Sequence, residues 1–361
     1  MARISEAQMT RDFHPLEVLE TRNEIGGQAK SVMFDVPPHL AQDFAWRAGQ
    51  HLTLRFWIKR EEVRRSYSIS SSPVSGDPLR ITVKRVKKGL VSNHINDTVQ
   101  QGDVIDVMPP FGSFCLDTDP EERRTHYFFG AGSGITPLHS MLQSVLLAEP
   151  WSVAHLAYGN ASADSILFKD EFAEYQQAFS ERLTVHHLLS KPSMWSSFAY
   201  WRRGVIDKDA IDALITENPP YAQNAQYYIC GPGGMNKAVK DALMSLGVPA
   251  NRIHMESYGG AQDTDDSIKG VDAIVDITLN GQRQPVQMAS GQTILQAAQQ
   301  AGLEPPYSCQ SGVCGACRCQ LKKGSVHMRA RTALDDNEIA KGAVLSCQAV
   351  ATMDKLAVSY D

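Results

Sequence analysis

The sequence lacks several features that define large classes of protein. No apolar run approaches the roughly eighteen residues that a membrane-spanning helix needs. Positive charge is not in excess, because the formal net charge is −5 at pH 7, and this argues against a nucleic-acid partner. The first residues contain no apolar core of the kind found in secretory signals, so we expect a cytoplasmic protein.

The chain is too long for one ordinary hydrophobic core. Its 361 residues predict two or three domains, and neither an internal repeat nor a low-complexity tract is visible. Small and charged residues at 117–124 and 259–266 predict joints between domains. We therefore expect domains at 14–120, 125–258 and 270–361, with a linker at 259–269.

Four cysteines near the C-terminus have the spacing of a [2Fe–2S] site. They are Cys309, Cys314, Cys317 and Cys347. The first three follow the pattern C-x4-C-x2-C, and the fourth comes after a long gap, as in plant-type ferredoxins. The small residues Gly312, Gly315 and Ala316 let backbone N–H groups approach the sulfurs and tune the reduction potential. The stretch 270–361 resembles a plant-type ferredoxin domain.

Two other uses of cysteine compete with this interpretation. A structural zinc site usually contains two short C-x2-C pairs, and the second pair is missing here. A disulfide framework is less favoured, because seven cysteines in a long chain without a secretion signal indicate a reducing compartment. Cys115 and Cys319 lack ligand-like spacing, and we expect both to be packed side chains.

Residues 14–116 predict short strands separated by turns. The predicted strands are 28–36, 50–56, 65–70, 79–86 and 104–108. Several strands at this spacing, without a long amphipathic helix between them, indicate an antiparallel β-barrel or sandwich.

Two motifs in this segment suit a planar cofactor that carries a phosphate, and the first resembles the R-x-Y-S flavin motif of the ferredoxin-reductase superfamily. In the strand at 65–68, R-S-Y-S, Arg65 and Tyr67 share one face, so a ring can stack on a planar cofactor while the guanidinium reaches a phosphate. Alone, this pattern is more typical of a half-exposed strand. A basic strand at 84–88 then leads into a helical turn at 89–93, and N–H groups at a helix start bind anions.

From residue 125 the pattern becomes strand, glycine turn and helix. The apolar run 127–129 precedes the sequence G-A-G-S-G-I-T-P at 130–137, and apolar residues then recur at helical spacing as far as 146. In such a βαβ opening a pyrophosphate lies against the helix N-terminus. Pro137 suits the first helical turn.

The alternation of strands and helices continues to residue 256. Predicted strands are 153–158, 183–189, 227–229 and 252–256, and predicted helices include 168–179 and 207–215. This order predicts a doubly wound parallel sheet. Cys230-Gly231-Pro232 follows one strand and resembles the second nicotinamide motif of flavin reductases, although a lone Cys230 is more often a core residue. Glu256 ends the last strand, where relatives of that kind carry an acidic residue, and a solvated carboxylate explains it as well as proton handling or a domain contact does.

The third segment begins with a hairpin and contains a short helix. Residues 271–277 alternate in polarity, and Asn280-Gly281 predicts the tight turn. A helix at 293–301 ends at Gly302. This order is similar to the α+β, β-grasp-like ferredoxin fold.

Together these motifs resemble the ferredoxin-NADP reductase superfamily with a C-terminal ferredoxin domain. The nearest resemblance is to reductase components of multicomponent oxygenases, the family of the phenylacetyl-CoA epoxidase and ketosteroid hydroxylase reductase subunits. It implies an enzyme that passes electrons from NAD(P)H through FAD and a [2Fe–2S] cluster to a partner oxygenase. The pattern P-x-G-x-F at 110–114 favours FAD over FMN.

The resemblance also implies roles for individual residues. Flavin-binding residues are Arg65, Tyr67, Ser68, Lys84, Gly89, Leu90, Val91 and Ser92. Nicotinamide-binding residues are Gly132, Ser133, Gly134, Thr136, Cys230, Gly231 and Pro232. Catalytic residues near the flavin and nicotinamide are Thr136, Cys230 and Glu256. Cluster ligands are Cys309, Cys314, Cys317 and Cys347.

The choice of coenzyme and of partner stays open at this level. Some NADPH-using relatives carry an arginine where this chain has Ala161, and Asp164 is close in sequence, so NADH is slightly favoured. Lys191, Arg202 and Arg203 are alternative sources of positive charge. The acceptor is an oxygenase, or else a hybrid-cluster protein or free ferredoxin. A zinc-stapled binding module without enzymatic activity is a second alternative.

Overall fold

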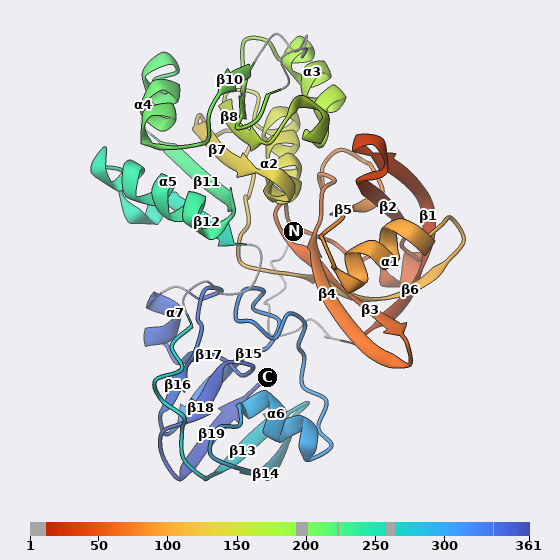
Figure 1. Cartoon of the computed structure of the whole chain (residues 1–361), viewed down its shortest axis with the longest axis vertical. Helices are drawn as coiled ribbons and strands as arrows, with labels where there is room; N and C mark the ends of the chain where they lie inside the picture. The colour runs from red at the N-terminus through yellow and green to blue at the C-terminus, as the bar shows by residue number, and fades with distance from the viewer. Residues whose placement is uncertain (1–11, 193–200, 222–223, 258–263, 335) are drawn as a thin grey trace. The chain divides into compact units, whose positions relative to one another are not determined.

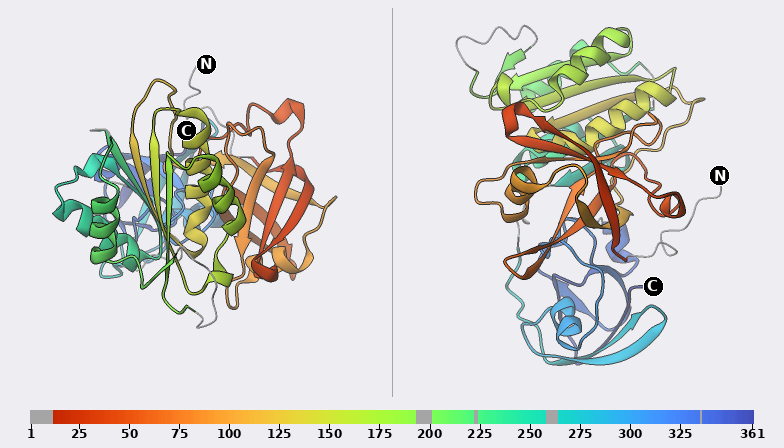
Figure 2. Two further views of the ribbon diagram at one scale, coloured as in Figure 1. Left: turned by 90° about the horizontal axis from the view of Figure 1, so that it is seen from above. Right: turned by 90° about the vertical axis from the view of Figure 1, so that its right-hand side faces the viewer.

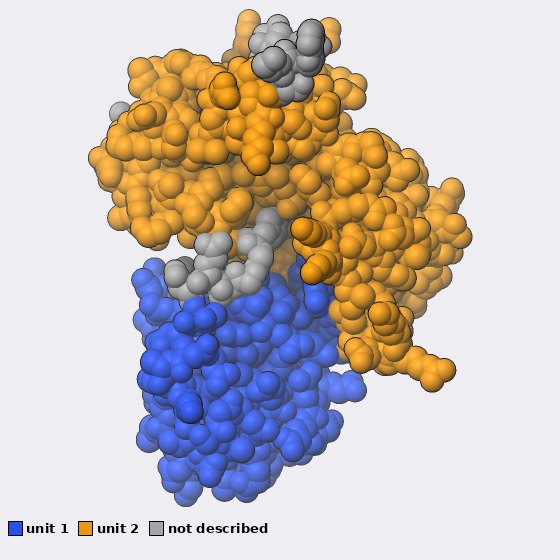
Figure 3. Space-filling view, viewed as in Figure 1, with its two compact units in different colours: residues 1–12, 64–66, 259–361 blue, residues 13–63, 67–258 orange. Residues whose placement is uncertain are grey.

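The computed structural model describes residues 12–192, 201–221, 224–257, 264–334 and 336–361. The chain divides into two compact units, coloured separately in Figure 3. Unit 1 comprises residues 1–12, 64–66 and 259–361, and unit 2 comprises 13–63 and 67–258. Part of the predicted linker, 259–263, lies outside the described residues, and 264–269 contains no helix or strand.

The first half of unit 2 is built on an antiparallel sheet, as predicted, which has six strands instead of the five expected (Figure 1). Its strands are β1 (His14–Glu24), β2 (Ala29–Asp35), β3 (His51–Ile58), β4 (Glu61–Ser68), β5 (Leu79–Lys84) and β6 (Val104–Phe111), in the order β4-β3-β6-β1-β2-β5. An isolated bridge between Ile69 and Ile81 connects the two edges, which closes the sheet into a barrel.

Two features of this barrel were not predicted from the sequence. The first is strand β1 itself. It alternates buried and exposed residues only as far as Val18, and its second half is polar. Strand β4 begins at Glu61, because Lys59 and Arg60 form a hairpin turn with φ values of 54° and 69°. Lysine and arginine are unusual where both central residues need positive φ, so no Asn-Gly signal marked the turn.

The second half of unit 2 is a doubly wound sheet of six parallel strands. They are β7 (Thr125–Ala131), β8 (Val153–Asn160), β9 (Leu183–Leu189), β10 (Trp201–Arg203), β11 (Ala225–Gly231) and β12 (Ile253–Ser257), in the order β10-β9-β8-β7-β11-β12. The chain proceeds outward from β7 to β10 and then returns to β11 beside β7. The carboxyl ends of β7 and β11 therefore form the topological switch point, where doubly wound sheets bind ligands.

Helices cover both faces of this sheet (Figure 2). They are α2 (Ile135–Ala148), α3 (Lys169–Ala178), α4 (Lys208–Glu217) and α5 (Gly233–Ser245). Helix α2 is buried along most of its length, and its residues share one hydrophobic core with Ala48, Phe114 and Leu116 of the barrel. This common core joins the barrel to the parallel sheet.

Unit 1 has the mixed fold expected for a ferredoxin. A five-stranded sheet contains β14 (Gln282–Met288), β13 (Ala273–Leu279), β19 (Lys355–Ser359), β15 (Arg318–Lys323) and β17 (Ala343–Leu345), in that order, and β16 (Val326–Met328) pairs with β18 (Ala349–Ala351). Asn280 and Gly281 have φ values of 52° and 72°, which confirms the predicted turn between β13 and β14. Helix α6 (Ile294–Gln300) begins at Thr293 in a capping box with Gln296.

Short helices complete the described structure. They are α1 (Leu90–Thr98), α7 (Asp336–Ala340) and 3₁₀ turns at Ile25–Gly27, Pro38–Leu40, Gly132–Gly134, Ala163–Ser165 and Ala250–Arg252. Among the helices formed by described residues, none is long and apolar enough to cross a membrane.

Candidate active site and cluster-binding loop

The four predicted cluster ligands lie together in unit 1. Three belong to the irregular segment between α6 and β15, and Cys347 lies between β17 and β18. Gly312 has a φ of +75°, and an added Cβ there would lie 2.9 Å from both Cβ and the carbonyl oxygen of Ala330. The loop therefore needs glycine at this position, for conformation and for space.

The sulfurs interact in two pairs. The Cys314 thiol donates a hydrogen bond toward Cys309, which lowers the pKa of Cys309 to about 5. Cys317 does the same for Cys347 and lowers its pKa. Across the described residues, no three His, Cys, Asp or Glu side chains converge on a single metal-ion position. Pairing two and two fits a cluster of two irons, each held by two thiolates.

Backbone N–H groups point at these sulfurs. The Ser311 nitrogen lies 3.4 Å from Cys309 Sγ. The backbone N–H groups of Gly312 and Ala316 are directed at Cys347 and Cys314; the pKa of Cys347 is lowered, chiefly by Cys317, whereas Cys309 and burial raise the pKa of Cys314. Such bonds favour the thiolate that a ligand must be, so the loop fits a [2Fe–2S] cluster.

Cys319 does not belong to this group of ligands. It lies on β15 and is buried in the hydrophobic core of the sheet. All seven cysteines of the chain are described, and none forms a disulfide. Cys115 donates its thiol hydrogen to the carbonyl oxygen of Gly112 at 3.2 Å.

The R-S-Y-S motif forms the last part of β4. Arg65 is exposed, Tyr67 is half-buried against the barrel core, and Ser68 is buried. Arg65 and Tyr67 share a strand face, as the alternation predicts. This arrangement offers a guanidinium and an aromatic ring on one face of the strand.

The second flavin motif forms the start of α1. Gly89 is the N-cap, and the next three residues make the first turn, whose N–H groups have no partners within the helix. An added Cβ at Gly89 would lie 2.3 Å from Ser92 Oγ and 3.1 Å from the Val86 carbonyl oxygen, so only glycine fits. Ser92 Oγ accepts a hydrogen bond from the Val86 nitrogen at 3.3 Å and thereby shapes this turn.

Lys84, at the end of β5, adds a basic group to this region. Burial lowers the pKa of Lys84. A partly buried lysine followed by a helix start is a suitable setting for a pyrophosphate. The residues at 84–92 therefore fit the phosphate end of FAD.

The glycine loop after β7 is formed by a 3₁₀ turn that leads into α2. Gly132 has a φ of +56°, and a Cβ added there would meet no described atom within 4 Å. The turn thus presents an open backbone surface, as close approach of a phosphate requires. Thr136 Oγ1 donates to the Ser133 carbonyl oxygen at 3.0 Å and stabilises the turn.

The two nicotinamide motifs touch each other. An added Cβ at Gly134 would lie 2.1 Å from the carbonyl oxygen of Cys230 and 3.0 Å from Cα of Gly231. Pro232 is the N-cap of α5, directly after Gly231. The motifs therefore form one surface at the carboxyl ends of β7 and β11, the switch point of the sheet.

Glu256 connects this surface to the flavin motif. Its Oε2 accepts a hydrogen bond from Ser68 Oγ at 3.4 Å and lies 3.9 Å from Cys230 Sγ. Ser68 comes from the barrel, Cys230 from β11 and Glu256 from β12, so three predicted residues meet. Arg65 belongs to the part of the chain assigned to unit 1, so its role toward the flavin stays a prediction.

Sequence reasoning missed Asn236, which holds Glu256 in place. Asn236 is 1% exposed, and its Nδ2 donates to the Glu256 carbonyl oxygen at 2.8 Å and lies 3.0 Å from Ser257 Oγ. It lies on the first turn of α5, after the C-G-P motif. In the sequence alone, an asparagine in an amphipathic helix does not indicate a function, because its hydrogen-bond partner is not yet known.

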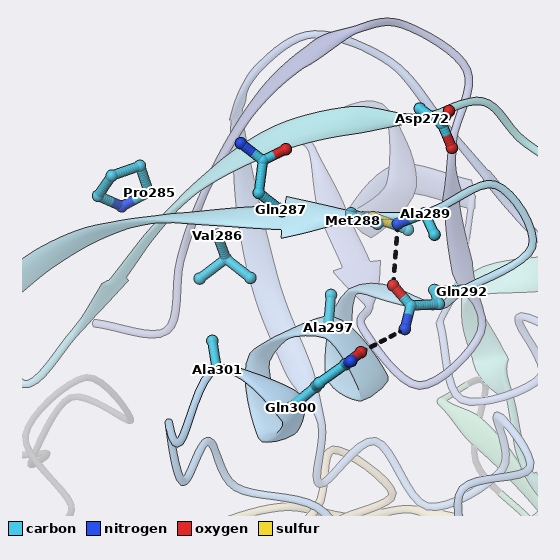
Figure 4. Close-up of a pocket in the computed structure, with 10 residues that line it drawn as sticks. All are labelled: Asp272, Pro285, Val286, Gln287, Met288, Ala289, Gln292, Ala297, Gln300 and Ala301. Carbon is cyan, nitrogen blue, oxygen red and sulfur yellow. Dashed lines mark hydrogen bonds between the residues drawn. The ribbon is translucent and has the colours of Figure 1, made fainter.

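A pocket elsewhere in unit 1 contains none of the predicted residues (Figure 4). It lies between β14 and α6. Gln292 accepts from the Ala289 nitrogen at 2.9 Å and donates to Gln300 at 2.7 Å. These bonds stabilise the turn before α6, and we assign the pocket no ligand.

Comparisons with known proteins agree with this geometry. Three family models match: an oxidoreductase FAD-binding domain at residues 17–115, an oxidoreductase NAD-binding domain at 128–241, and a 2Fe-2S iron-sulfur cluster binding domain at 277–352. One subunit of the 1,2-phenylacetyl-CoA epoxidase of Escherichia coli (strain K12) is 31% identical, over 97% of this chain and 98% of that protein.

Two further proteins match along most of this chain. The ferredoxin reductase component of 3-ketosteroid-9-alpha-monooxygenase from Rhodococcus rhodochrous is 33% identical over 92% of each chain. The solved structure of phthalate dioxygenase reductase matches with a TM-score of 0.59 at 23% identity, over 96% of this chain and 98% of that one. At that identity the structural match supports the fold.

Proposed function

From the premise that the chain belongs to the family of oxygenase reductase components with FAD-binding, NAD-binding and 2Fe-2S domains, we propose how its own residues serve electron transfer to a partner oxygenase. When bound, the cofactors would supply the redox chemistry: FAD would accept one hydride, which carries two electrons, and release electrons singly to a [2Fe–2S] cluster that carries one at a time. The protein binds these groups, orients them and excludes water.

The meeting of Ser68, Cys230 and Glu256 carries the proposal. These residues are the end of the flavin motif, the second nicotinamide motif and the last strand of the parallel sheet. Cys230 is fully buried and leaves space beside the glycine turn for a nicotinamide, while Thr136 fixes that turn. Glu256 offers a carboxylate that accepts a hydrogen bond from Ser68 Oγ and would be placed to hold a proton near the flavin.

In unit 1, we propose that Cys309 and Cys314 hold one iron and that Cys317 and Cys347 hold the other. The support is the pairwise interaction of the four sulfurs and the N–H groups directed at them. In unit 2, the proposed flavin-binding residues are those at 65–68 and 84–92.

NADH is the proposed electron donor. A 2′-phosphate requires positive charge near the end of β8, where this chain has Ala161. Arg202, one alternative source of charge, pairs with Glu217 on α4. A ribose site without an arginine at position 161 suits NADH better than NADPH.

The proposed acceptor is the oxygenase component of a multicomponent system, and the proposed location is the cytoplasm. The named relatives act with an epoxidase and a monooxygenase, which supports an oxygenase acceptor over a hybrid-cluster protein or free ferredoxin. Four thiolate ligands require a reducing compartment, which supports the location.

An anaerobic absorption spectrum of the purified protein tests this proposal. We expect flavin and iron–sulfur bands, both bleached faster by NADH than by NADPH, with one FAD and two irons per chain. Faster bleaching by NADPH would overturn the donor assignment. Flavin without iron would overturn the cluster assignment, and a colourless protein would favour the zinc-stapled binding module.

A further inference from the structure

A buried histidine on α2 links the two halves of unit 2. His139 is fully buried and follows Thr136 of the glycine loop by three residues. Its Nδ1 lies 2.8 Å from the carbonyl oxygen of Ser70, two residues beyond Ser68 of the flavin motif. A carbonyl oxygen only accepts, so Nδ1 carries the hydrogen. One hydrogen bond thus joins the helix of the nicotinamide loop to the segment that follows the flavin strand.

The other ring nitrogen faces a carboxylate. His139 Nε2 lies 2.9 Å from Oε2 of Glu171, on α3. The imidazole therefore lies between the Ser70 carbonyl oxygen on one side and the Glu171 carboxylate on the other.

Two arginines of the barrel also lie beside the Glu171 carboxylate. Arg80 on β5 donates to both oxygens of Glu171, at 3.1 and 3.2 Å, and Arg22 on β1 lies 3.6 Å away. Burial raises the pKa of Glu171, but hydrogen bonds and charge from His139 and Arg80 outweigh it and lower the pKa. The Phe168 ring, 4.2 Å from the His139 ring centroid, helps to exclude water from this pair.

Neighbouring serines add further hydrogen bonds between α2 and the segment after β4. Ser140 Oγ donates to the Ser71 carbonyl oxygen at 2.6 Å, and the hydroxyls of Ser72 and Ser144 lie 2.7 Å apart. All these bonds run from α2 to the segment that directly follows the flavin strand. They hold α2, which precedes β8 of the parallel sheet, against the barrel.

We propose that His139 is a positioning residue for hydride transfer, which aligns the nicotinamide loop with the flavin strand through Ser70 and the Glu171–Arg80 pair. The inference rests on the proposed function. Its physical basis is that a misplacement of about 1 Å costs roughly 100-fold in rate when reacting groups are held by two separate elements. His139 itself touches neither reacting group.

The chain offers a matched control for this inference. His126 Nε2 lies 2.9 Å from Glu149 Oε2, and both side chains are fully buried. The Glu149 carboxylate also contacts Arg124 and Ser152, close to the amino ends of β7 and β8, and accepts from the Asp119 nitrogen at 3.3 Å. This second pair is also a fully buried histidine beside a carboxylate, with Glu149 0% and Glu171 23% exposed, but its hydrogen bonds to described residues stay near those strand ends, away from 65–80.

The test compares His139→Asn, His139→Gln and His139→Leu with His126→Gln in the FAD- and cluster-loaded protein. An asparagine amide can replace Nδ1–H toward Ser70, whereas glutamine reaches toward Glu171. Stopped-flow flavin reduction gives the rate at saturating NADH and the KM. The long-wavelength charge-transfer absorbance of the nicotinamide–flavin complex reports stacking, and thermal unfolding reports stability.

We expect His139→Leu to lower the saturated rate by about 10- to 100-fold and to weaken the charge-transfer absorbance. His139→Asn should retain several-fold more of both than His139→Gln. His126→Gln should lower Tm and keep the rate within about twofold of the parent. If His139→Leu does not fold, the comparison of asparagine with glutamine decides.

Two outcomes would overturn the inference: equal rates and absorbance in the asparagine and glutamine variants, or equal losses at His139 and His126. A parent protein whose flavin is not reduced by either coenzyme would instead overturn the proposed function. The two failures are therefore distinguishable.

Discussion

At the scale of single residues, the site depends on the contacts that the Glu256 carboxylate makes with side chains from other strands. Glu256 is only partly buried, so exposure alone does not distinguish it from other strand-end carboxylates. Its contacts distinguish it, because Ser68 belongs to the proposed flavin motif and Cys230 to the proposed nicotinamide motif.

Replacing Glu256 by glutamine tests its role in proton transfer. The amide keeps the size of the side chain and its contact with Ser68 but removes the charge and the proton acceptor. We expect flavin reduction by NADH to slow by about 100-fold, with FAD content unchanged, as measured by anaerobic stopped-flow. Glu121→Gln, at an exposed position, is the control. An unchanged rate would reduce Glu256 to a contact between domains.

Buried neutral histidines make the stability of unit 2 depend on pH. His51 is 4% exposed and His187 3% exposed, and burial lowers the pKa of each to about 4. The unfolded chain has a histidine pKa near 6.5, so between these values only the unfolded state binds the proton. Stability therefore falls as the pH drops from about 6.5 to 4.

Urea unfolding at pH 7 and pH 5 measures this effect. Each of the two histidines should account for a loss of about 2 kcal/mol in the free energy of unfolding between these pH values. His51→Gln should remove its own share of the difference while leaving that of His187. The same pH dependence in the variant and the parent would show that His51 is protonated in the folded state.

At the scale of elements, two helix starts and one switch point place the proposed ligand sites. Helix α1 begins at Gly89 and α2 at the glycine turn, so each presents first-turn N–H groups that no intrahelical bond uses. The order of strands brings the ends of β7 and β11 together. The backbone contact between Gly134 and Cys230 depends on that order.

Alanine at Gly134 tests this contact, with Gly234 as the matched control. An added Cβ meets the Cys230 carbonyl oxygen at 2.1 Å in the first case and no described atom within 4 Å in the second. We expect Gly134→Ala to raise the Kd for NADH about tenfold or more, because backbone must shift, and to cost about 1–3 kcal/mol of stability. Gly234→Ala should change the Kd by less than about twofold. Titration by flavin absorbance measures both, and equal Kd values would contradict the assigned contact.

At the scale of the whole molecule, the chain is modular. The cluster ligands all lie in unit 1, whereas the nicotinamide motifs and Glu256 lie in unit 2. The three family models match separate stretches in the same order. We therefore expect the flavin and nicotinamide sites to keep their ligands when the cluster is lost, and the cluster site to keep its cluster when the flavin is lost.

Cys347→Ser tests this modularity, with Cys319→Ala as the control for a buried cysteine in the same domain. We expect the serine variant to lose most of its iron and its iron–sulfur absorbance, since serine is a poorer ligand for iron, while NADH still reduces the flavin at a rate within about twofold of the parent. The alanine variant should retain iron. Iron analysis and stopped-flow spectra measure both, and loss of flavin reduction together with iron would refute the modular interpretation.

The sequence by itself determined the features that depend on short segments. Cysteine spacing, the glycine turn after an apolar strand and the Asn280-Gly281 hairpin are encoded within a few residues, because local backbone geometry fixes which residues suit them. The fold classes of the first two segments followed from their periodicity and that of the third from its resemblance to a ferredoxin, and the structure and comparisons confirm them. The turn at Lys59 and Arg60 was missed because its residues are atypical for that geometry.

Only the tertiary structure decided which distant residues meet. Glu256 and Ser68 are separated by 188 residues, and His139 and Ser70 by 69. No local pattern marks His139, Glu171 or Asn236, since a buried polar residue has meaning only with its partner. The order of strands in the sheet and the packing of α2 against the barrel create these pairs, and both are properties of the folded chain.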